Sequence, residues 1–258
     1  MLRSLVAKKG CNMKAAVYSG TRNLYADMVT AAKSLIANSS VEKVFFLIED
    51  ETFPYELPEI IETMNVSGQR FFTKGGANFR TNFTYMSLLR VCYTKLFPDL
   101  DKVLQLDVDT VVVDNIDALW DVDLTGKWFA ACQEPLSTYK PYGPTYYNIG
   151  VAMFNLKQIR EDGADEKLID FLNTVNVPYI DQDAWNRYGV RKAVELETRF
   201  NESCVTGFSE EPAIVHFAGI KNWQNNPRTS RREYLKKYRE MSWEDVLNGK
   251  DSDCSPNI

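Results

Sequence analysis

Two aspartates one residue apart, Asp107 and Asp109, are the side chains in this sequence best suited to chemistry. A mainly apolar segment precedes them at 103–106 and another follows at 111–113, so the pair lies just past a predicted buried strand. Because side chains alternate along extended chain, both carboxylates face one site. Two like charges this close raise each other's pKa unless a cation lies between them. Carboxylate oxygens suit Mg²⁺, Mn²⁺ or Ca²⁺, so the pair predicts a divalent-metal site.

The same stretch, DVDTV, has two other interpretations. Solvated turn aspartates or a helix cap are the ordinary structural explanation, and the apolar flanks on both sides argue against it. The stretch also resembles the nucleophile motif of haloacid-dehalogenase-type phosphatases, in which the first aspartate attacks a phosphoryl group. That motif normally lies on the first strand, whereas here it follows three predicted strands. A metal-dependent phosphatase or nucleotidyltransferase stays open as an alternative.

The chain contains a single histidine, His216, in the segment IVHFAGIKNW. A histidine after an apolar strand is by default structural, but an imidazole is also a good ligand for Mn²⁺ or Zn²⁺. Gly219 lets the backbone approach a ligand, and Lys221 supplies positive charge. Together with the two aspartates, these residues would form a site for a metal-bound diphosphate.

Composition limits the classes of partner. The net charge of −5 repels nucleic acid and anionic membranes, so we expect no nucleic-acid partner, and an anionic ligand needs local positive charge or a metal. Five widely spaced cysteines without a CxxC pair indicate reduced thiols in the cytoplasm. No apolar run approaches the roughly 18 residues needed to span a bilayer. Residues 1–12 lack the apolar core of a signal peptide and are expected to form an N-terminal extension.

Predicted strands and helices alternate in the first half of the chain, which favours an α/β fold with a mainly parallel sheet covered on both faces. The predicted strands of this half are 15–18, 44–48, 69–72 and 103–106, and the predicted helices are 24–35, 59–64 and 83–97.

The second half adds strands at 128–132 and 150–154, a strand and turn at 213–219, and helices at 165–175 and from Asp183. Residues 137–148 form a loop with four tyrosines, Tyr139, Tyr142, Tyr146 and Tyr147. We expect a single domain over 13–224, followed by a charged helical tail at 225–258. The tail aromatics either pack on the domain or touch a membrane surface.

Four segments carry a family resemblance: LQLDVDTVVVDNIDALWDVDL, YYNIGVAMFNL, DQDAWN and HFAGIKNW. In this order, between about Lys14 and Trp223, they resemble glycosyltransferase family 8, the family of glycogenin and the bacterial lipooligosaccharide galactosyltransferases. The resemblance implies a GT-A fold, which is Rossmann-like, and a UDP-glucose or UDP-galactose donor. It also implies Mn²⁺, with Mg²⁺ as the alternative ion, and retention of the anomeric configuration.

The resemblance assigns roles to individual residues. Asp107, Asp109 and His216 match the metal ligands, and Asp107 also touches the donor. The residues that match the rest of the donor site are Thr21, Tyr25, Arg90, Asn148, Gly219 and Lys221. Thr21 and Tyr25 would lie against the uracil, and Asn148 would line the donor sugar. The proline that the family places before the tryptophan is Asn222 here.

Three residues match the catalytic positions of the family. Asp181 would accept hydrogen bonds from sugar hydroxyls, Gln182 would lie against the reacting face, and Lys221 would stabilise the leaving diphosphate. An amide oxygen is a poor nucleophile, so we expect attack on the face from which the diphosphate departs. The four tyrosines of the 137–148 loop could form a stacking platform for the acceptor.

The expected reaction moves a hexose from UDP to a hydroxyl of a carbohydrate, a lipid-linked sugar or a protein. A non-catalytic nucleotide-sugar binder is the remaining alternative. We expect a cytoplasmic protein, and peripheral contact of the tail with the inner face of the membrane is the second option for its location.

Overall fold

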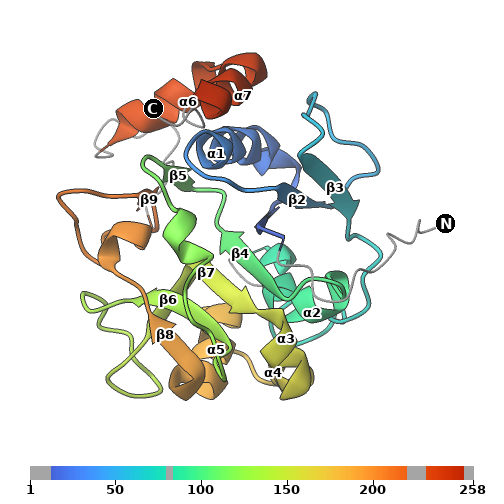
Figure 1. Cartoon of the computed structure of the whole chain (residues 1–258). Helices are drawn as coiled ribbons and strands as arrows, with labels where there is room; N and C mark the ends of the chain where they lie inside the picture. The colour runs from blue at the N-terminus through green and yellow to red at the C-terminus, as the bar shows by residue number, and fades with distance from the viewer. Residues whose placement is uncertain (1–12, 80–83, 220–230, 253–258) are drawn as a thin grey trace.

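A computed structural model describes residues 13–79, 84–219 and 231–252 of the chain. Its centre is a seven-stranded sheet with helices on both faces (Figure 1). In spatial order the strands are β3 (Ile61–Asn65), β2 (Lys43–Ile48), β1 (Ala15–Ser19), β4 (Lys102–Leu106), β7 (Tyr147–Asn155), β6 (Phe129–Gln133) and β8 (Ala193–Glu195). Only β7 runs antiparallel to its neighbours in this sheet, which confirms the predicted α/β fold with a mainly parallel sheet.

Two hydrophobic cores lie on the two faces of the sheet, and adjacent residues of a strand belong to different cores. Ala15 and Val17 of β1 pack in one core, whereas Ala16 and Tyr18 pack in the other. This division is the period-two alternation of extended chain. Since both faces are buried, the central strands are apolar at nearly every position.

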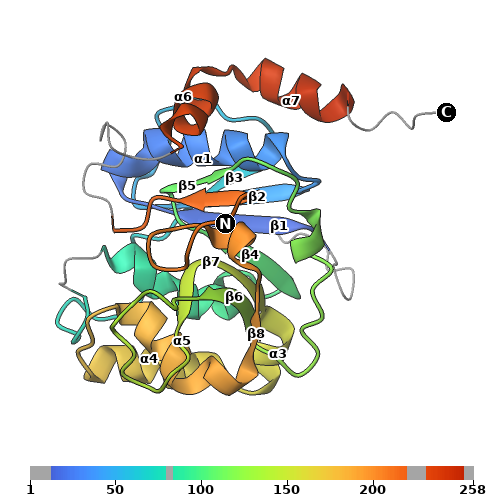
Figure 2. The ribbon, with the colours of Figure 1, turned by 90° about the vertical axis from the view of Figure 1, so that its left-hand side faces the viewer.

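The helices form layers above and below the sheet (Figures 1 and 2). On one side lies α1 (Tyr25–Ala37), with α6 (Arg232–Glu240) and α7 (Trp243–Ser252) outside it. On the other side lie α2 (Tyr93–Leu96), α3 (Leu156–Glu161), α4 (Ala164–Thr174) and α5 (Ile180–Gly189). None of the helices in this part of the chain is both long and apolar enough to cross a bilayer.

A small second sheet pairs β5 (Thr110–Val112) with β9 (Ile214–His216) in antiparallel register. Val111 and Val215 of this ribbon pack with Leu235 and Tyr238 of α6. The Tyr238 hydroxyl also accepts a 2.6 Å hydrogen bond from Asn38 Nδ2 at the end of α1. Helix α6 therefore covers the ribbon and shares its hydrophobic core.

Two sequence predictions for the first half were wrong. Residues 59–64 were expected to form a short helix, but β3 occupies 61–65 and pairs with β2, with Ile61 opposite Val44. Residues 69–72 were expected to form the third strand, but they form no regular structure, and residues 71 and 72 are bends. Short apolar segments are ambiguous between helix and strand, and here pairing with β2 decides.

Three other elements differ in extent. The helix predicted at 83–97 is a 3₁₀ helix, η2 (Tyr85–Cys92), that continues into α2, and Phe83 lies outside the described residues. α5 begins at Ile180, so Asp181 and Gln182 belong to its first turn. The tail is two helices because Ser242 caps the second one: its Oγ accepts from the Asp245 N–H at 3.1 Å and donates to Asp245 Oδ2 at 2.7 Å.

Because α6 covers the ribbon, truncating its buried side chain should destabilise the whole domain. Leu235 is 3% exposed, and Leu235→Ala should lower the free energy of unfolding by about 2–5 kcal/mol. Urea unfolding measures this change, with the exposed neighbour Lys236→Ala as the control. An unchanged midpoint in Leu235→Ala would show that the tail is not part of the cooperative unit.

Candidate metal and donor site

The turn that carries Asp107 and Asp109 links the two sheets. The Asp107 N–H donates to the Gly150 carbonyl at 2.7 Å, which extends the β4–β7 pairing by one residue. The Asp109 carbonyl accepts from the Phe217 N–H at 2.9 Å, and Thr110 lies opposite His216 in the ribbon. Backbone pairing on both sides therefore fixes the turn and places His216 beside it.

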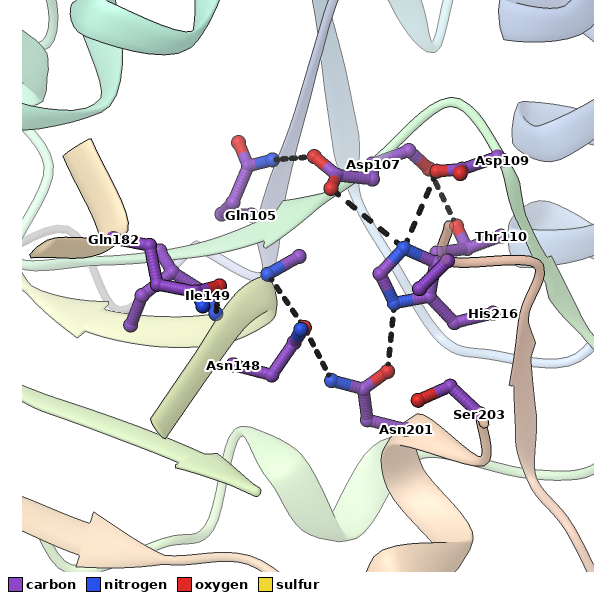
Figure 3. Close-up of polar contacts among 12 residues, drawn as sticks. Gln105, Asp107, Asp109, Thr110, Asn148, Ile149, Gln182, Asn201, Ser203 and His216 are labelled. Carbon is purple, nitrogen blue, oxygen red and sulfur yellow. Dashed lines mark hydrogen bonds and ion pairs between the residues drawn. The ribbon is translucent and has the colours of Figure 1, made fainter. Parts of the chain in front are cut away.

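The three predicted metal ligands come together (Figure 3). His216 Nε2 lies 3.3 Å from Asp109 Oδ1 and 3.7 Å from Asp107 Oδ2. One ligand atom from each residue lies within 4.8 Å of the others. Two hard oxygens and one imidazole nitrogen form a donor set that suits Mn²⁺. A cation with ligand distances of about 2.1 Å separates adjacent ligand atoms by about 3 Å. The two distances from His216 Nε2 to the carboxylates, 3.3 and 3.7 Å, are slightly longer than this spacing.

Because Gly150 has no side chain, it provides the space that the His216 ring and the Asp107 carboxylate occupy. A Cβ atom at position 150 would lie 2.3 Å from His216 Cε1 and 2.8 Å from Asp107 Oδ2. Both distances are far below van der Waals contact, so the imidazole ring rests directly on the backbone of β7. Glycine inside an apolar strand thus marks close approach of a functional side chain.

The charges of the cluster are strongly coupled. Burial raises the pKa of Asp107, and the nearby Arg90 guanidinium opposes that rise. Burial also acts to raise the pKa of Asp109, but the adjacent His216 ring acts in the opposite direction, and the pKa is lowered from its ordinary value. Burial alone would lower the pKa of His216, whereas the Asp109 carboxylate raises it above its ordinary value. A proton on His216 therefore balances the carboxylates where a divalent cation would otherwise do so.

Arg90 connects the cluster of Asp107, Asp109 and His216 to α5. Its Nη2 pairs with Asp107 Oδ1, and its Nη1 lies 3.2 Å from Asp181 Oδ2. Arg90 comes from η2, whose three-residue repeat turns Met86 and Leu89 into the core. Burial raises the pKa of Asp181 to about 6, even though Arg90 acts to lower it.

Asn148 and Gln182 lie on the other side of the cluster (Figure 3). Gln182 Oε1 accepts from the Ile149 N–H at 3.1 Å, and Gln182 Nε2 donates to Glu134 Oε1 at 3.1 Å. Asn148 Nδ2 donates to the same Glu134 oxygen at 2.7 Å. One buried carboxylate therefore holds both amides that the family resemblance assigns to the donor sugar.

Comparison with known proteins agrees with this arrangement. Residues 16–227 match the family described as Glycosyl transferase family 8. The chain belongs to glycosyl transferase family 8.

Two curated relatives illustrate how this family-8 chain compares with longer proteins. A putative glycosyltransferase of Haemophilus influenzae is 28% identical over 69% of the chain and 60% of its own length. Glycosyltransferase GlyB of Streptococcus pneumoniae is 23% identical over 93% of the chain and 65% of its own length. The chain therefore spans less than two thirds of either relative.

Solved structures share the GT-A fold with this family-8 chain. Glycosyltransferase GlyE of Streptococcus pneumoniae superposes with a TM-score of 0.72 at 22% identity, over 93% of this chain and 64% of the other. The galactosyltransferase LgtC, in complex with donor and acceptor sugar analogues, has a TM-score of 0.69 at 21% identity, over 92% of this chain and 99% of its own.

The remaining predicted donor contacts are less well placed. Thr21 follows β1, and its hydroxyl donates to Asn23 Oδ1 at 2.6 Å. Tyr25 is 1% exposed: its hydroxyl donates to Asp50 Oδ2 at 2.9 Å and its ring lies 4.8 Å from Phe53. In this arrangement Tyr25 supports the turn after β2 and presents no open ring face to uracil. Gly219 has a φ of +71°, and Lys221 lies outside the described residues.

The tyrosine loop divides into buried and accessible residues. Tyr146 and Tyr147 are 1% and 6% exposed, so they pack inside the protein and cannot serve as a platform. The Tyr139 hydroxyl donates to Asp183 Oδ2 at 3.0 Å, and the Tyr146 hydroxyl donates to Asp183 Oδ1 at 2.8 Å. Asp183, on α5, therefore anchors the loop beside Gln182.

Glu134, Gly150 and Asn201 belong to the site, although the sequence analysis did not identify them. Gly150, within an apolar strand, was a recognisable signal of close backbone approach. Asn201 Oδ1 lies 2.9 Å from His216 Nδ1, but nothing in the local sequence of Asn201 indicates this role. Its role arises from the three-dimensional packing alone.

Metal binding should depend on pH through His216, because only the neutral imidazole coordinates a cation. Its pKa is raised, so Mn²⁺ affinity should begin to fall with decreasing pH already above about 6.5, the ordinary histidine value. Calorimetric titration of Mn²⁺ between about pH 8 and about pH 6 measures this dependence. A constant affinity over that range would contradict coordination by His216.

Gly150→Ala should disrupt the metal site because the new methyl group displaces the His216 ring. By analogy with other losses of ligand support, Mn²⁺ affinity should fall about 10- to 100-fold. Gly68→Ala is a matched control, since a Cβ there meets nothing within 4 Å. Equal affinities in the two folded variants would mean that the ring position does not govern binding.

Proposed function

We propose that this protein transfers a hexose, glucose or galactose, from a UDP-sugar to an acceptor hydroxyl with retention of configuration. The observation that carries the proposal is the meeting of Asp107, Asp109 and His216 at the carboxyl end of β4, in a chain of glycosyl transferase family 8. In open α/β sheets, ligands bind beyond the carboxyl ends of the strands, which supports the same location. Because the chain spans only part of its curated relatives, the activity of the whole protein rests on this proposal.

The metal would be Mn²⁺, with Mg²⁺ as the alternative, held by Asp107, Asp109 and His216. When bound, such a cation neutralises charge on the departing diphosphate, an effect worth several kcal/mol. Arg90 holds Asp107 from the opposite side and fixes the direction of its carboxylate. Lys221 and Gly219 are the proposed closing segment over the diphosphate.

Gln182 and Asp181 would face the donor sugar from the first turn of α5. The amide oxygen of Gln182 already accepts from the Ile149 N–H and has little basicity, so it is poorly suited as a covalent nucleophile. This engagement supports attack by the acceptor on the face that the diphosphate leaves, with a β-phosphate oxygen taking the acceptor's proton. Asp181 would accept hydrogen bonds from sugar hydroxyls, and its ion pair with Arg90 favours the charged form that does so.

The acceptor would enter beside the tyrosine loop. Tyr139 packs edge-to-face against Tyr179 at 4.9 Å, and Tyr179 is 42% exposed. Together with the partly exposed Tyr142, these rings can stack on a sugar, and a carbohydrate acceptor is the chemistry they favour. A lipid-linked sugar or a protein hydroxyl would present the same reacting group.

We place the protein in the cytoplasm, with contact at the inner face of the membrane as the alternative. Two tail aromatics argue against the membrane contact, because Tyr238 is 2% exposed and the Trp243 indole donates to the Glu56 carbonyl at 3.0 Å. The tail therefore uses these two rings for packing.

The phosphatase alternative is less compatible with the site. A nucleophilic Asp107 needs an accessible oxygen, whereas Oδ1 contacts Arg90 and Gln105, and Oδ2 faces the His216 ring. A binder without turnover would share the metal site but would release no UDP.

Release of UDP from UDP-glucose or UDP-galactose in the presence of Mn²⁺ tests the proposal. Asp109→Asn should reduce this activity by about 100-fold or more, because a metal ligand is lost. The exposed Asp121→Asn is the matched control and should keep full activity. Mn²⁺-dependent hydrolysis of a phosphomonoester instead would favour the phosphatase, and UDP binding without any release would favour the binder.

A further inference from the structure

We propose that Asn201 is a positioning residue that keeps a proton on Nδ1 of His216 and thereby reserves Nε2 for the metal. The proposal deepens the function proposed above and rests on its divalent-cation site, but it is independent of the donor sugar. Asn201 is fully buried, at the end of the 3₁₀ helix η5 (Thr198–Asn201).

The two nitrogens of His216 face different surroundings. Nε2 faces Asp107 and Asp109, whereas Nδ1 lies 2.9 Å from Asn201 Oδ1 (Figure 3). An imidazole nitrogen can donate or accept, and an amide can be turned by 180°, so this contact alone does not fix the proton. The direction of this hydrogen bond follows from neighbouring groups that can only donate or only accept.

Asn148 has two such neighbours. The Gly150 N–H, which can only donate, lies 3.0 Å from one end of the Asn148 amide, and that end must be the oxygen. The Glu134 carboxylate, which accepts, lies 2.7 Å from the other end, and that end must be the NH₂ group. A backbone amide and a carboxylate thus fix the orientation of Asn148 independently of each other.

The orientation of the Asn148 amide determines the orientation of the Asn201 amide, which in turn determines the proton position on His216. Asn201 approaches the Asn148 oxygen at 2.9 Å, so it must present its NH₂ group there. Its own oxygen therefore faces His216, and a hydrogen bond at that contact requires a proton on Nδ1. Were the Asn201 amide reversed, it would donate to Nδ1, and the neutral ring would carry its proton on Nε2, toward the cation position.

A backbone hydrogen bond next to Asn201 fixes its position relative to His216. The His216 N–H donates to the Glu202 carbonyl at 2.8 Å, directly after Asn201. The Glu202 side chain, 2% exposed, forms an ion pair with Arg231, whose Nη2 lies 3.0 Å from Glu202 Oε2. The segment that carries Asn201 is therefore tied to β9 and to the start of α6.

The same network reaches the proposed sugar side of the site. Glu134 Oε1 accepts from Gln182 Nε2 as well as from Asn148, so one carboxylate orients both amides. His216 on the metal side and Gln182 on the sugar side are therefore held by one continuous set of hydrogen bonds.

Nuclear magnetic resonance of ¹⁵N-histidine-labelled protein tests the proton position directly, because His216 is the only histidine and gives one imidazole spectrum. In the metal-free protein, at a pH where the ring is neutral, we expect an Nδ1-bound proton that is protected from exchange with water. Adding diamagnetic Cd²⁺ should change the Nε2 signal and leave the Nδ1 proton in place. In Asn201→Leu the protection should be lost, and Mn²⁺ affinity should fall about 10- to 100-fold.

Two further variants keep the test decisive. Asn201→Asp retains an oxygen toward Nδ1 and should keep the protected proton, while its second oxygen opposes that of Asn148. Asn78→Leu removes a buried amide that contacts Leu172 and Val175, far along the chain from His216, and should leave the imidazole signals unchanged.

An unprotonated Nδ1 in the native protein, or an unchanged spectrum and affinity in Asn201→Leu, would overturn the proposal. If Asn201→Leu does not fold, loss of the protected proton in Asn201→Asp would overturn it equally. Failure of UDP-sugar turnover would instead contradict the proposed function, since the spectrum of the metal-free protein does not depend on turnover.

Discussion

The site depends on the pairing of β5 with β9, which sets Thr110 opposite His216. This pairing brings the imidazole to two carboxylates that the chain separates by more than a hundred positions. The neighbouring hydrogen bonds, from Asp107 to Gly150 and from Phe217 to Asp109, fix the turn from both sides. A shift of one residue in the ribbon would turn His216 to the opposite face, because side chains alternate along a strand. The α6 residues that cover the β5–β9 ribbon therefore support the geometry of the Asp107, Asp109 and His216 cluster.

Electrostatics explains why so many polar residues are buried around this turn. Asp107, Asp109 and Asp181 place three carboxylates near one another, and in the described part of the chain the basic side chains of Arg90 and His216 face them. Uncompensated burial of charge is costly, so each carboxylate has a partner. The neutral amides of Asn148, Asn201 and Gln182 complete the network: Asn201 donates to Asn148, and Asn148 and Gln182 donate to the Glu134 carboxylate. Such a network holds the three candidate metal ligands close together without a cation.

The sequence predicted the elements that have a strong local signal. The alternation of apolar strands with helical segments such as α1 predicted the α/β class. The DxD motif after β4 located the Asp-Asp-His cluster. β3 was missed because Ile61–Asn65 has no local feature that separates strand from helix, and only pairing with β2 decides. Asn201 and Glu134 could not be found because their roles come from contacts across the fold. Tyr25 was assigned to uracil by resemblance, but its burial against Phe53 follows from packing that the sequence does not show.

Electron spin-echo spectroscopy of Mn²⁺ bound to ¹⁵N-histidine-labelled protein tests the central claim most directly. The account predicts a hyperfine coupling from one imidazole nitrogen, which can be assigned at once because the chain has one histidine. That coupling should vanish in His216→Ala, and Mn²⁺ affinity should fall with it. Mn²⁺ that binds tightly to the native protein without any coupling to the labelled imidazole would contradict the account.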